Sequence, residues 1–201
     1  HEGRFWQFPS ATSCPKPLQQ TVPMWVAARS PITFDYAVAN DCNIMSWPLT
    51  LPFSEAVKYR NQLDDAIAKN GGTYAGRFAM MRHTSVYETA SDRQSALDAT
   101  RGVLSQFGNL IMKSGEVRNG FPDPVPLESL EGNFRVEPKM LEENLMFGSP
   151  DQVIDKLGKY QEIGVDAFIY YASMGLGMEQ QRRSLQLFIE NVMPAFNNRK
   201  S

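Results

Sequence analysis

Short apolar runs of strand length alternate along this chain with amphipathic stretches of helix length. The first apolar run covers 24–28, and Pro31 soon after it fits the first turn of a helix, where a missing N–H costs nothing. Apolar residues then recur from Phe34 at the i, i+3, i+4 spacing of one helix face, which predicts a helix over 31–40. A second apolar segment follows at 43–47. This order of strand, polar turn, helix and strand is typical of a βαβ unit, whose strands are parallel.

The same alternation continues to the end of the chain, interrupted by one long irregular stretch at 113–138 that is rich in proline and glycine. Around this stretch the pattern predicts a helix at 54–70, a strand at 74–87, a helix at 92–112, regular structure at 139–147, a helix at 150–163, a strand at 165–171 and a helix at 178–196. The last helix is expected to turn Leu185, Phe188, Ile189 and Val192 toward a core.

Local signals mark the ends of two of these helices. Ser54 is the expected N-cap of the second helix. Ser149 as N-cap, Pro150 at the first helical position and Gly164 after the last turn delimit the helix before the final strand.

The succession of elements predicts an α/β fold with a parallel sheet and right-handed crossovers. Its strands fit either a small doubly wound sheet or half of an eight-stranded barrel. The chain starts in a proline-containing segment, 1–22, that reads as a loop, and this start favours the half-barrel.

Composition narrows the class of protein further. The 201 residues are 42% hydrophobic with a net charge of −2, which gives no electrostatic footprint for nucleic acid or for an acidic membrane surface. No apolar run approaches the ~20 residues that span a bilayer. Cys14 and Cys42 lie far apart and match no metal-ligand spacing, so we expect neither a disulfide framework nor a metal site, and a cytoplasmic location.

The polar turn after the first strand is the main candidate for chemistry. Arg29, Ser30 and Thr33 surround the start of the predicted helix. The first N–H groups of a helix have no internal partner and its dipole favours an anion there, so two hydroxyls and a guanidinium would complete an anion cradle. The alternative is that Ser30 is a plain helix cap, a role that can coexist with anion binding.

Two other signals are weaker. His83 is the only histidine after the first residue, and a lone histidine on a strand is more often a surface or satisfied core residue than a general base. Gly175 and Gly177 form a G-x-G that could bind phosphate, although flexibility near the mouth of a site is the more economical interpretation.

Two blocks of sequence carry a family resemblance. The first is PMWVAARSPIT at 23–33, continued by Ser46-Trp47, and the second is GSPDQVIDKLGKYQEIGVDAFIYY at 148–171, continued by LFIENVMPAF at 187–196. With these blocks the chain resembles the C-terminal part of the bacterial luciferase-like, flavin-dependent monooxygenase family over most of its length.

The resemblance implies a fold and a domain organisation. The implied fold is the C-terminal half of a (β/α)8 TIM barrel of the luciferase-like type, with about four βα units in residues 1–201 and about four N-terminal units absent. The stretch 113–138 would be the insertion that acts as a mobile lid in luciferase, or a loop without function.

The resemblance also implies an activity. Reduced FMN, delivered by a separate flavin reductase, would react with O2 and oxygenate a small, largely apolar organic substrate, in a protein expected to be a homodimer. Alternatives on the same fold are hydride transfer with the deazaflavin F420, a non-catalytic flavin-binding subunit, and a metabolite-binding lyase.

The resemblance implies binding residues but no catalytic residue. Ala28, Arg29, Ser30 and Thr33 would hold the flavin phosphate, and Ser46 would line the isoalloxazine site. Trp25 and Trp47 are expected to pack inside the barrel rather than stack on the flavin. The known catalytic histidine and reactive cysteine of luciferase lie in the other half of the barrel.

Overall fold

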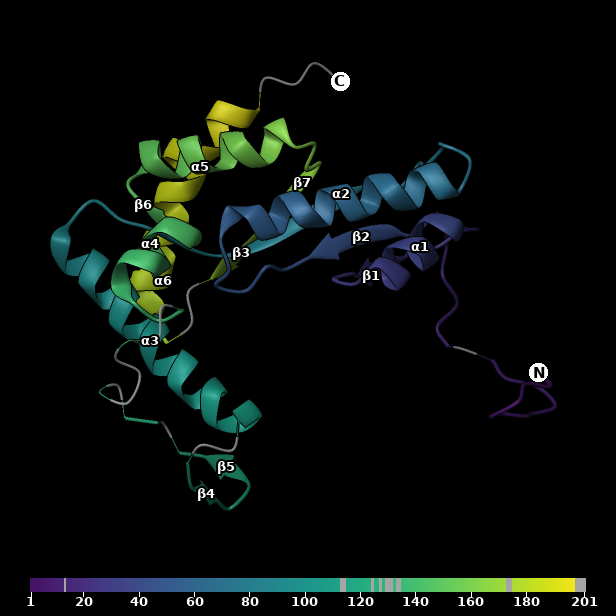
Figure 1. Ribbon diagram of the computed structural model, residues 1–201, viewed down its shortest axis with the longest axis horizontal. Coiled ribbons are helices and arrows are strands. Elements are labelled where there is room, and N and C mark those ends of the chain that lie inside the picture. The colour runs from purple at the N-terminus through teal and green to yellow at the C-terminus, as the bar shows by residue number, and fades with distance from the viewer. Residues whose placement is uncertain are drawn as a thin grey trace.

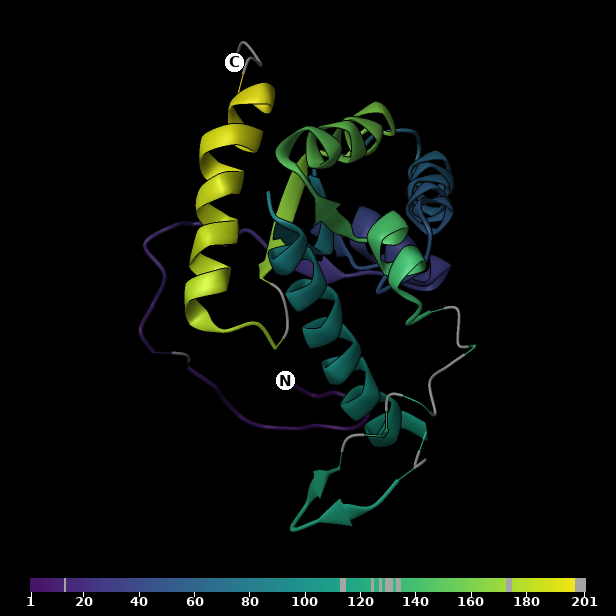
Figure 2. The ribbon, with the colours of Figure 1, turned by 90° about the vertical axis from the view of Figure 1, so that its left-hand side faces the viewer.

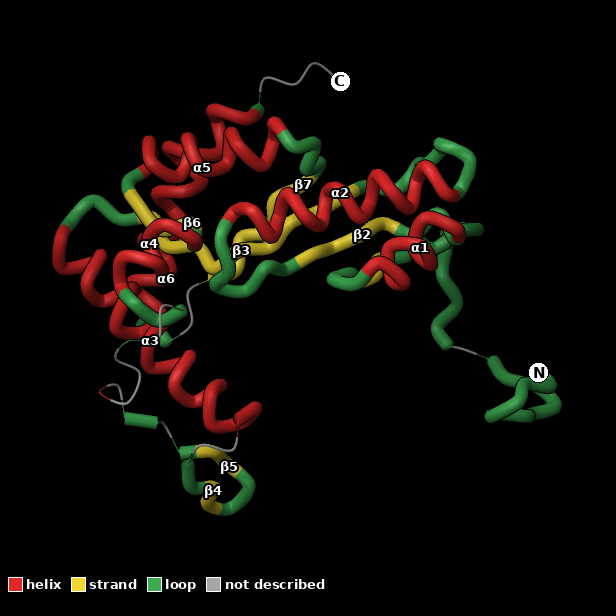
Figure 3. Tube along the Cα trace, in the orientation of Figure 1, coloured by secondary structure: helices red, strands yellow, loops and turns green. Residues whose placement is uncertain are grey.

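A five-stranded parallel sheet forms the centre of the computed structural model. The structure describes residues 1–12, 14–112, 115–123, 125–126, 128, 132, 135–172 and 175–197. The sheet contains β1 (Trp25–Ala27), β2 (Asn43–Ser46), β3 (Phe78–Val86), β6 (Met146–Gly148) and β7 (Ala167–Ala172). The helices are α1 (Pro31–Ala39), α2 (Phe53–Lys69), α3 (Ala90–Met112), α4 (Pro138–Asn144), α5 (Pro150–Glu162) and α6 (Met178–Leu187) (Figures 1 and 3).

The pairing register places β3 at the centre of the sheet. Ala79 pairs with both Met45 of β2 and Ala167 of β7, so these two strands flank β3 on opposite edges. Thr84 pairs with both β6 and β7, so β6 continues along the edge of β3 that β2 occupies at the start of the strand. Among the described residues, β1, β6 and β7 each pair with a single strand, so β1 and β6 have open edges on one side of β3 and β7 has one on the other side.

The two faces of the sheet differ in what covers them. Phe78 and Met80 of β3 and Phe168 and Tyr170 of β7 belong to the main hydrophobic core, which also takes residues from α1, α2, α5 and the C-terminal helix. We call this side the helix face. Figure 2 shows α2, α5 and the C-terminal helix arranged around the strands. Residues that alternate with these, such as Met81 and His83, lie on the opposite side, which we call the inner face.

The predicted helix starts have different outcomes. Ser149 caps α5 as predicted: its hydroxyl accepts from the Gln152 N–H, and the Gln152 side chain accepts from the Ser149 N–H. The prediction for Ser54 is wrong, because α2 begins at Phe53 and Pro52 occupies the N-cap, where its carbonyl accepts from the Glu55 N–H.

The C-terminal helix is not one regular helix as predicted. After α6 the chain continues as a π-helical segment η2 (Phe188–Val192) and a 3-10 segment η3 (Met193–Phe196). Pro194 has no N–H to donate to the carbonyl one α-helical turn earlier, which accounts for the irregular end. Phe188 and Val192 are buried, but Leu185 and Ile189 are 42% and 50% exposed, so the predicted inward face is half wrong.

The stretch 113–138 lies partly outside the described residues. Its described part contains the antiparallel pair β4 (Val117–Arg118) and β5 (Phe121–Pro122), which extends beyond the end of α3 (Figure 2). Asn109 holds this pair to α3, because its side-chain amide donates to the carbonyls of Glu116 and Asp123 at 2.9 and 2.8 Å. The strand β6 was predicted only as regular structure, since three residues give no period. Within the described ranges, no helix is long and apolar enough to cross a membrane.

Candidate functional site

The carboxyl ends of β1 and β2 are joined into one rim by hydrogen bonds around Ala28. The Ala28 N–H donates to the Met45 carbonyl at 3.0 Å, and the Ser46 hydroxyl donates to the Ala28 carbonyl at 2.7 Å. Both Ala28 and Ser46 are buried. Ser46 therefore serves to hold the rim together, and its hydroxyl is already used within the fold.

Beyond this rim, the start of α1 presents hydroxyl groups that the helix does not use. Ser30 has the extended backbone of an N-cap residue, yet its side chain makes no capping hydrogen bond. Its Oγ lies 3.0 Å from Oγ1 of Thr33, on the surface. The first turn of α1 holds no acidic residue, so nothing there opposes an anion. The start of α1 therefore presents two surface hydroxyls at the positive end of the helix dipole.

Arg29 stands next to this hydroxyl pair but points partly toward α2. Its Nε donates to the Tyr59 hydroxyl at 3.3 Å, while the residue as a whole is exposed. The structure thus brings four of the predicted residues together at one strand end, in the order Ala28, Arg29, Ser30 and Thr33, and adds Ser46 through its bond to Ala28. Their role in cofactor binding stays a prediction.

A cluster of three rings lies on the inner face and was missed as a unit. The ring centroid of His83 lies 4.6 Å from that of Tyr171 and 5.3 Å from that of Trp47, and the Trp47 and Tyr171 centroids are 5.6 Å apart. We call these three residues the inner-face cluster. They come from the second halves of β3 and β7 and from the residue after β2, at the same end of the strands as the start of α1.

Two nitrogen atoms of this cluster are buried without a hydrogen-bond partner among the described residues. They are Nδ1 of His83 and Nε1 of Trp47. Burial and, to a smaller extent, the neighbouring Arg82 cation together lower the pKa of His83 from 6.5 to about 4. The imidazole is therefore neutral at physiological pH. The prediction that His83 is a surface or satisfied core residue does not describe it, because it is buried and its Nδ1 is not satisfied.

The register could have revealed this cluster. His83 pairs with Tyr171, and in-register residues of parallel strands share a face. Trp47 follows Met45 by two positions and therefore lies on the same side. Sequence alone does not supply the register, and each ring taken separately has the pattern of ordinary packing.

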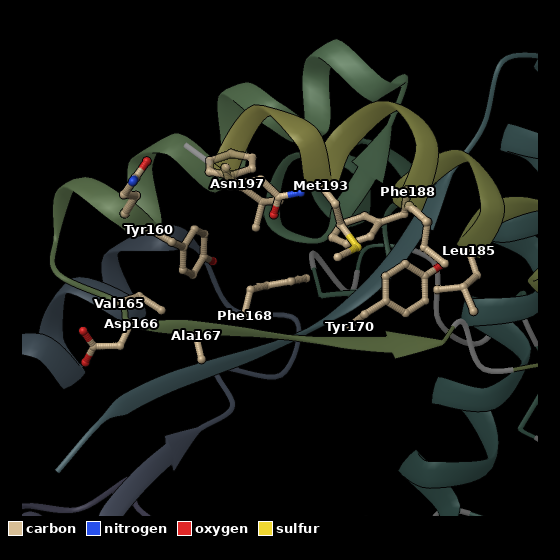
Figure 4. Close-up of a pocket in the computed structure, with 14 residues that line it drawn as sticks. Tyr160, Val165, Asp166, Ala167, Phe168, Tyr170, Leu185, Phe188, Met193 and Asn197 are labelled. Atoms are coloured by element: carbon tan, nitrogen blue, oxygen red, sulfur yellow. The ribbon is translucent and has the colours of Figure 1, made fainter. Parts of the chain in front are cut away.

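A cavity lies elsewhere in the described part of the chain. It has a volume of about 480 Å³ and opens on the helix face beside the edge strand β7 (Figure 4). Phe168 and Tyr170 of β7 face Phe188 and Met193 of the C-terminal helix across it. The cavity also reaches Val165 and Asp166 before the start of β7, away from the carboxyl ends of the strands. We therefore do not place the functional site there.

Comparisons with known proteins bear on the family and the fold of this chain. Residues 1–167 match the family model of luciferase-like monooxygenases. The oxygenase component of a flavin-dependent trigonelline monooxygenase from Acinetobacter baylyi is 33% identical over all 201 residues, which correspond to 56% of that protein.

Solved structures show the same fold at lower sequence identity. An F420-dependent secondary alcohol dehydrogenase in complex with an F420–acetone adduct aligns with a TM-score of 0.68 at 19% identity, covering 98% of this chain and 56% of that one. The FMN complex of the oxygenating constituent of 3,6-diketocamphane monooxygenase from Pseudomonas putida aligns with a TM-score of 0.59 at 13% identity, covering 97% and 57%. The chain thus spans about half the length of these relatives, and the α/β parallel sheet corresponds to about half of a luciferase-like TIM barrel.

Proposed function

The chain belongs to the luciferase-like monooxygenase family, and we propose that it carries the phosphate-binding part of a flavin-dependent oxygenase site. The observation that supports this best is the unused hydroxyl pair at the start of α1. Ser30 occupies the N-cap but caps nothing, and its hydroxyl meets that of Thr33 instead. A structural cap would have turned its oxygen toward the helix N–H groups.

The residues at the start of α1 fit the phosphate of FMN or of F420. In the proposed complex the hydroxyls of Ser30 and Thr33 and the N–H of Ile32 bind the phosphate oxygens, because Pro31 has no N–H and the N–H groups of Thr33 and Phe34 donate to the Ser30 carbonyl. The Arg29 guanidinium adds positive charge at the same place. Ala28 and Ser46 act as positioning residues, because their hydrogen bond fixes the strand ends from which this turn starts.

The inner face provides an apolar surface next to this rim. Reduced FMN, when bound, supplies the electrons with which O2 oxygenates a small organic substrate. The chain's own contribution is to hold the phosphate and to exclude water from the site with apolar inner-face residues such as Met45 and Met81. We propose that the stretch 113–138 assists this exclusion as a lid.

The proposed partners follow from the relatives. The Acinetobacter relative is named as an oxygenase component, so we propose that a separate reductase supplies the reduced flavin to this protein too. We propose a homodimer on the family resemblance. The acceptor of the oxygen atom is a small organic molecule.

A second candidate is hydride transfer with F420, favoured by the alignment with the F420-dependent alcohol dehydrogenase. Anaerobic titration of the protein with reduced FMN and with F420, followed by measurement of O2 uptake, separates the two. O2 uptake with reduced FMN supports oxygenation, whereas F420 reduction by an alcohol without O2 uptake supports hydride transfer. Binding of flavin with neither reaction would indicate a non-catalytic subunit.

The double variant Ser30→Ala with Thr33→Ala tests the phosphate site. Loss of two hydrogen bonds to a charged group should weaken the binding of reduced FMN by about 100-fold, measured by anaerobic fluorescence titration. Thr73→Ala is the matched control, because it removes an exposed hydroxyl from the turn before β3 at the opposite end of the strands. Unchanged FMN affinity in the double variant would show that the hydroxyl pair does not bind the cofactor.

A further inference from the structure

The inner-face cluster of Trp47, His83 and Tyr171 has the shape of a corner. The Trp47 ring is nearly perpendicular to both other rings, at 73° to His83 and 86° to Tyr171, while His83 and Tyr171 are inclined to each other by only 31°. The three rings therefore contact one another both edge to face and in a tilted arrangement. Stacked and edge-to-face contacts are the two arrangements that aromatic rings prefer.

The hydrogen-bonding capacity of this corner is not used by the described part of the chain. Nε1 of Trp47 can only donate, and a neutral imidazole has one donating and one accepting nitrogen. A buried donor or acceptor left without a partner costs about 1–3 kcal/mol, and buried polar groups in native proteins are paired almost without exception. Two such atoms in contacting rings indicate a partner that comes from outside these strands.

The surroundings of the corner give His83 no partner within the sheet. The neighbouring inner-face positions are Met45 on β2, Met81 and Ser85 on β3 and Ile169 on β7. Only Ser85 is polar, and it makes no hydrogen bond to Nδ1 of His83. An imidazole in such a setting adds polarity where packing alone would favour an apolar ring. The two unpaired nitrogens therefore distinguish this part of the inner face from ordinary apolar packing.

We propose that the inner-face cluster is a substrate subsite for a planar heteroaromatic molecule. Trp47 Nε1 donates a hydrogen bond to an acceptor on the ring, and His83 Nδ1 pairs with a second polar position of the same molecule. Tyr171 supplies the stacking wall. This assignment depends on the proposed function, because the subsite lies at the same end of the strands as the phosphate rim, and it names the class of substrate.

The low pKa of His83 agrees with this role. A histidine that stays neutral at the pH of the cell keeps one accepting nitrogen, whereas an imidazolium would only donate.

The test uses 3-hydroxypyridine, a planar ring with one acceptor and one donor, and compares it with cyclohexanol, which keeps the hydroxyl but has no aromatic face. The three tryptophans give separate indole N–H signals in a 15N-labelled protein. We expect 3-hydroxypyridine to shift the Trp47 signal. The signal of Trp6, which is exposed in the segment 1–22, should stay unchanged. Cyclohexanol should shift neither at the same concentration.

Variants assign the contact to the two nitrogens. His83→Phe keeps a ring and removes the nitrogens, so it should weaken 3-hydroxypyridine binding about tenfold, and Trp47→Phe should do the same. His1→Phe is the matched control, since His1 is exposed in the N-terminal arm. If His83→Phe fails to fold, Trp47→Phe carries the test alone.

The affinity for reduced FMN, measured in the same variants, separates this inference from the proposed function. The subsite predicts unchanged FMN affinity in His83→Phe. Loss of FMN affinity with unchanged binding of 3-hydroxypyridine would overturn it by assigning the corner to the flavin ring. Equal binding of 3-hydroxypyridine and cyclohexanol, or no effect of either ring variant, would overturn it by showing that the cluster only packs. Failure of the proposed function would appear instead in the Ser30 and Thr33 double variant.

Discussion

Arg82 and His83 are consecutive residues of β3 that point to opposite faces of the sheet. Both are polar and both are buried, at 0% and 2% exposure. Arg82 donates from Nε to the Tyr160 hydroxyl at 2.8 Å and from Nη1 to the carbonyls of Leu49 and Leu51 at 3.0 and 2.8 Å. His83 has no partner at Nδ1 among the described residues. Burial alone therefore does not distinguish these two polar residues, whereas the state of their hydrogen bonds does.

The largest expected effect on stability comes from replacing Arg82, whose guanidinium makes several hydrogen bonds within the fold. Arg82→Met removes every donor and leaves the carbonyls of the β2–α2 loop and the Tyr160 hydroxyl unpaired. We expect the free energy of unfolding, measured by urea denaturation at pH 7.5, to fall by about 4 kcal/mol. Arg182→Met, which removes a guanidinium from an exposed ion pair with Glu179, should leave the midpoint close to that of the parent. A parent-like midpoint for Arg82→Met would mean that the loop does not depend on this residue.

The next largest effect is a pH dependence of stability that comes from His83. The folded protein protonates His83 only near pH 4, while the unfolded chain binds this proton near pH 6.5. Between these values the unfolded state binds more protons, so stability falls as the pH is lowered from 6.5 to 4, by about 3 kcal/mol in total. Arg82 is the charged neighbour that adds to this shift.

The measurement compares parent and His83→Phe in urea at pH 7.5, 5.5 and 4.5. The variant should lose this part of the pH dependence, while His1→Phe should keep it. A slope in His83→Phe equal to that of the parent would place the proton uptake on other groups and would remove the argument that His83 is buried as the neutral form.

The smallest effects concern two serines at helix starts. Ser149 makes a reciprocal capping box, so Ser149→Ala should cost about 1 kcal/mol of stability. Ser30 makes no capping bond, so Ser30→Ala should change stability by less than about 0.5 kcal/mol, again in urea. Equal losses would show that Ser30 caps α1 in solution and would weaken its assignment to a ligand.

Local signals predicted much of the fold. The helices at 31–39 and 150–162 and the strands around them follow from spacing, from prolines at the first helical position and from one true cap. The family blocks at 23–33 and 148–171 contain these same signals. The start of α2 and the end of the C-terminal helix were predicted wrongly. Pro52 occupies the N-cap of α2, and Pro194 lies in the irregular end of the last helix, and the backbone effect of a proline there is not visible in the spacing of apolar side chains.

The candidate site was predicted in part. The turn of Ala28 to Thr33 follows from a strand, a proline and hydroxyls that are close in the chain. The bond that uses the Ser46 hydroxyl joins residues 18 positions apart, and the turn of Arg29 toward Tyr59 joins residues 30 apart, so neither was visible in a local pattern.

The sequence by itself determined that this chain is an α/β protein of parallel strands with a polar turn after the first strand, because those features depend on neighbours in the chain. Only the tertiary structure decided which polar side chains the fold uses and which it leaves open. Arg82 and His83 are indistinguishable in that respect along the sequence. The pairing of β3 with β2 and β7 turns one toward carbonyls that satisfy it and the other toward Trp47 and Tyr171, where its Nδ1 finds no partner among the described residues.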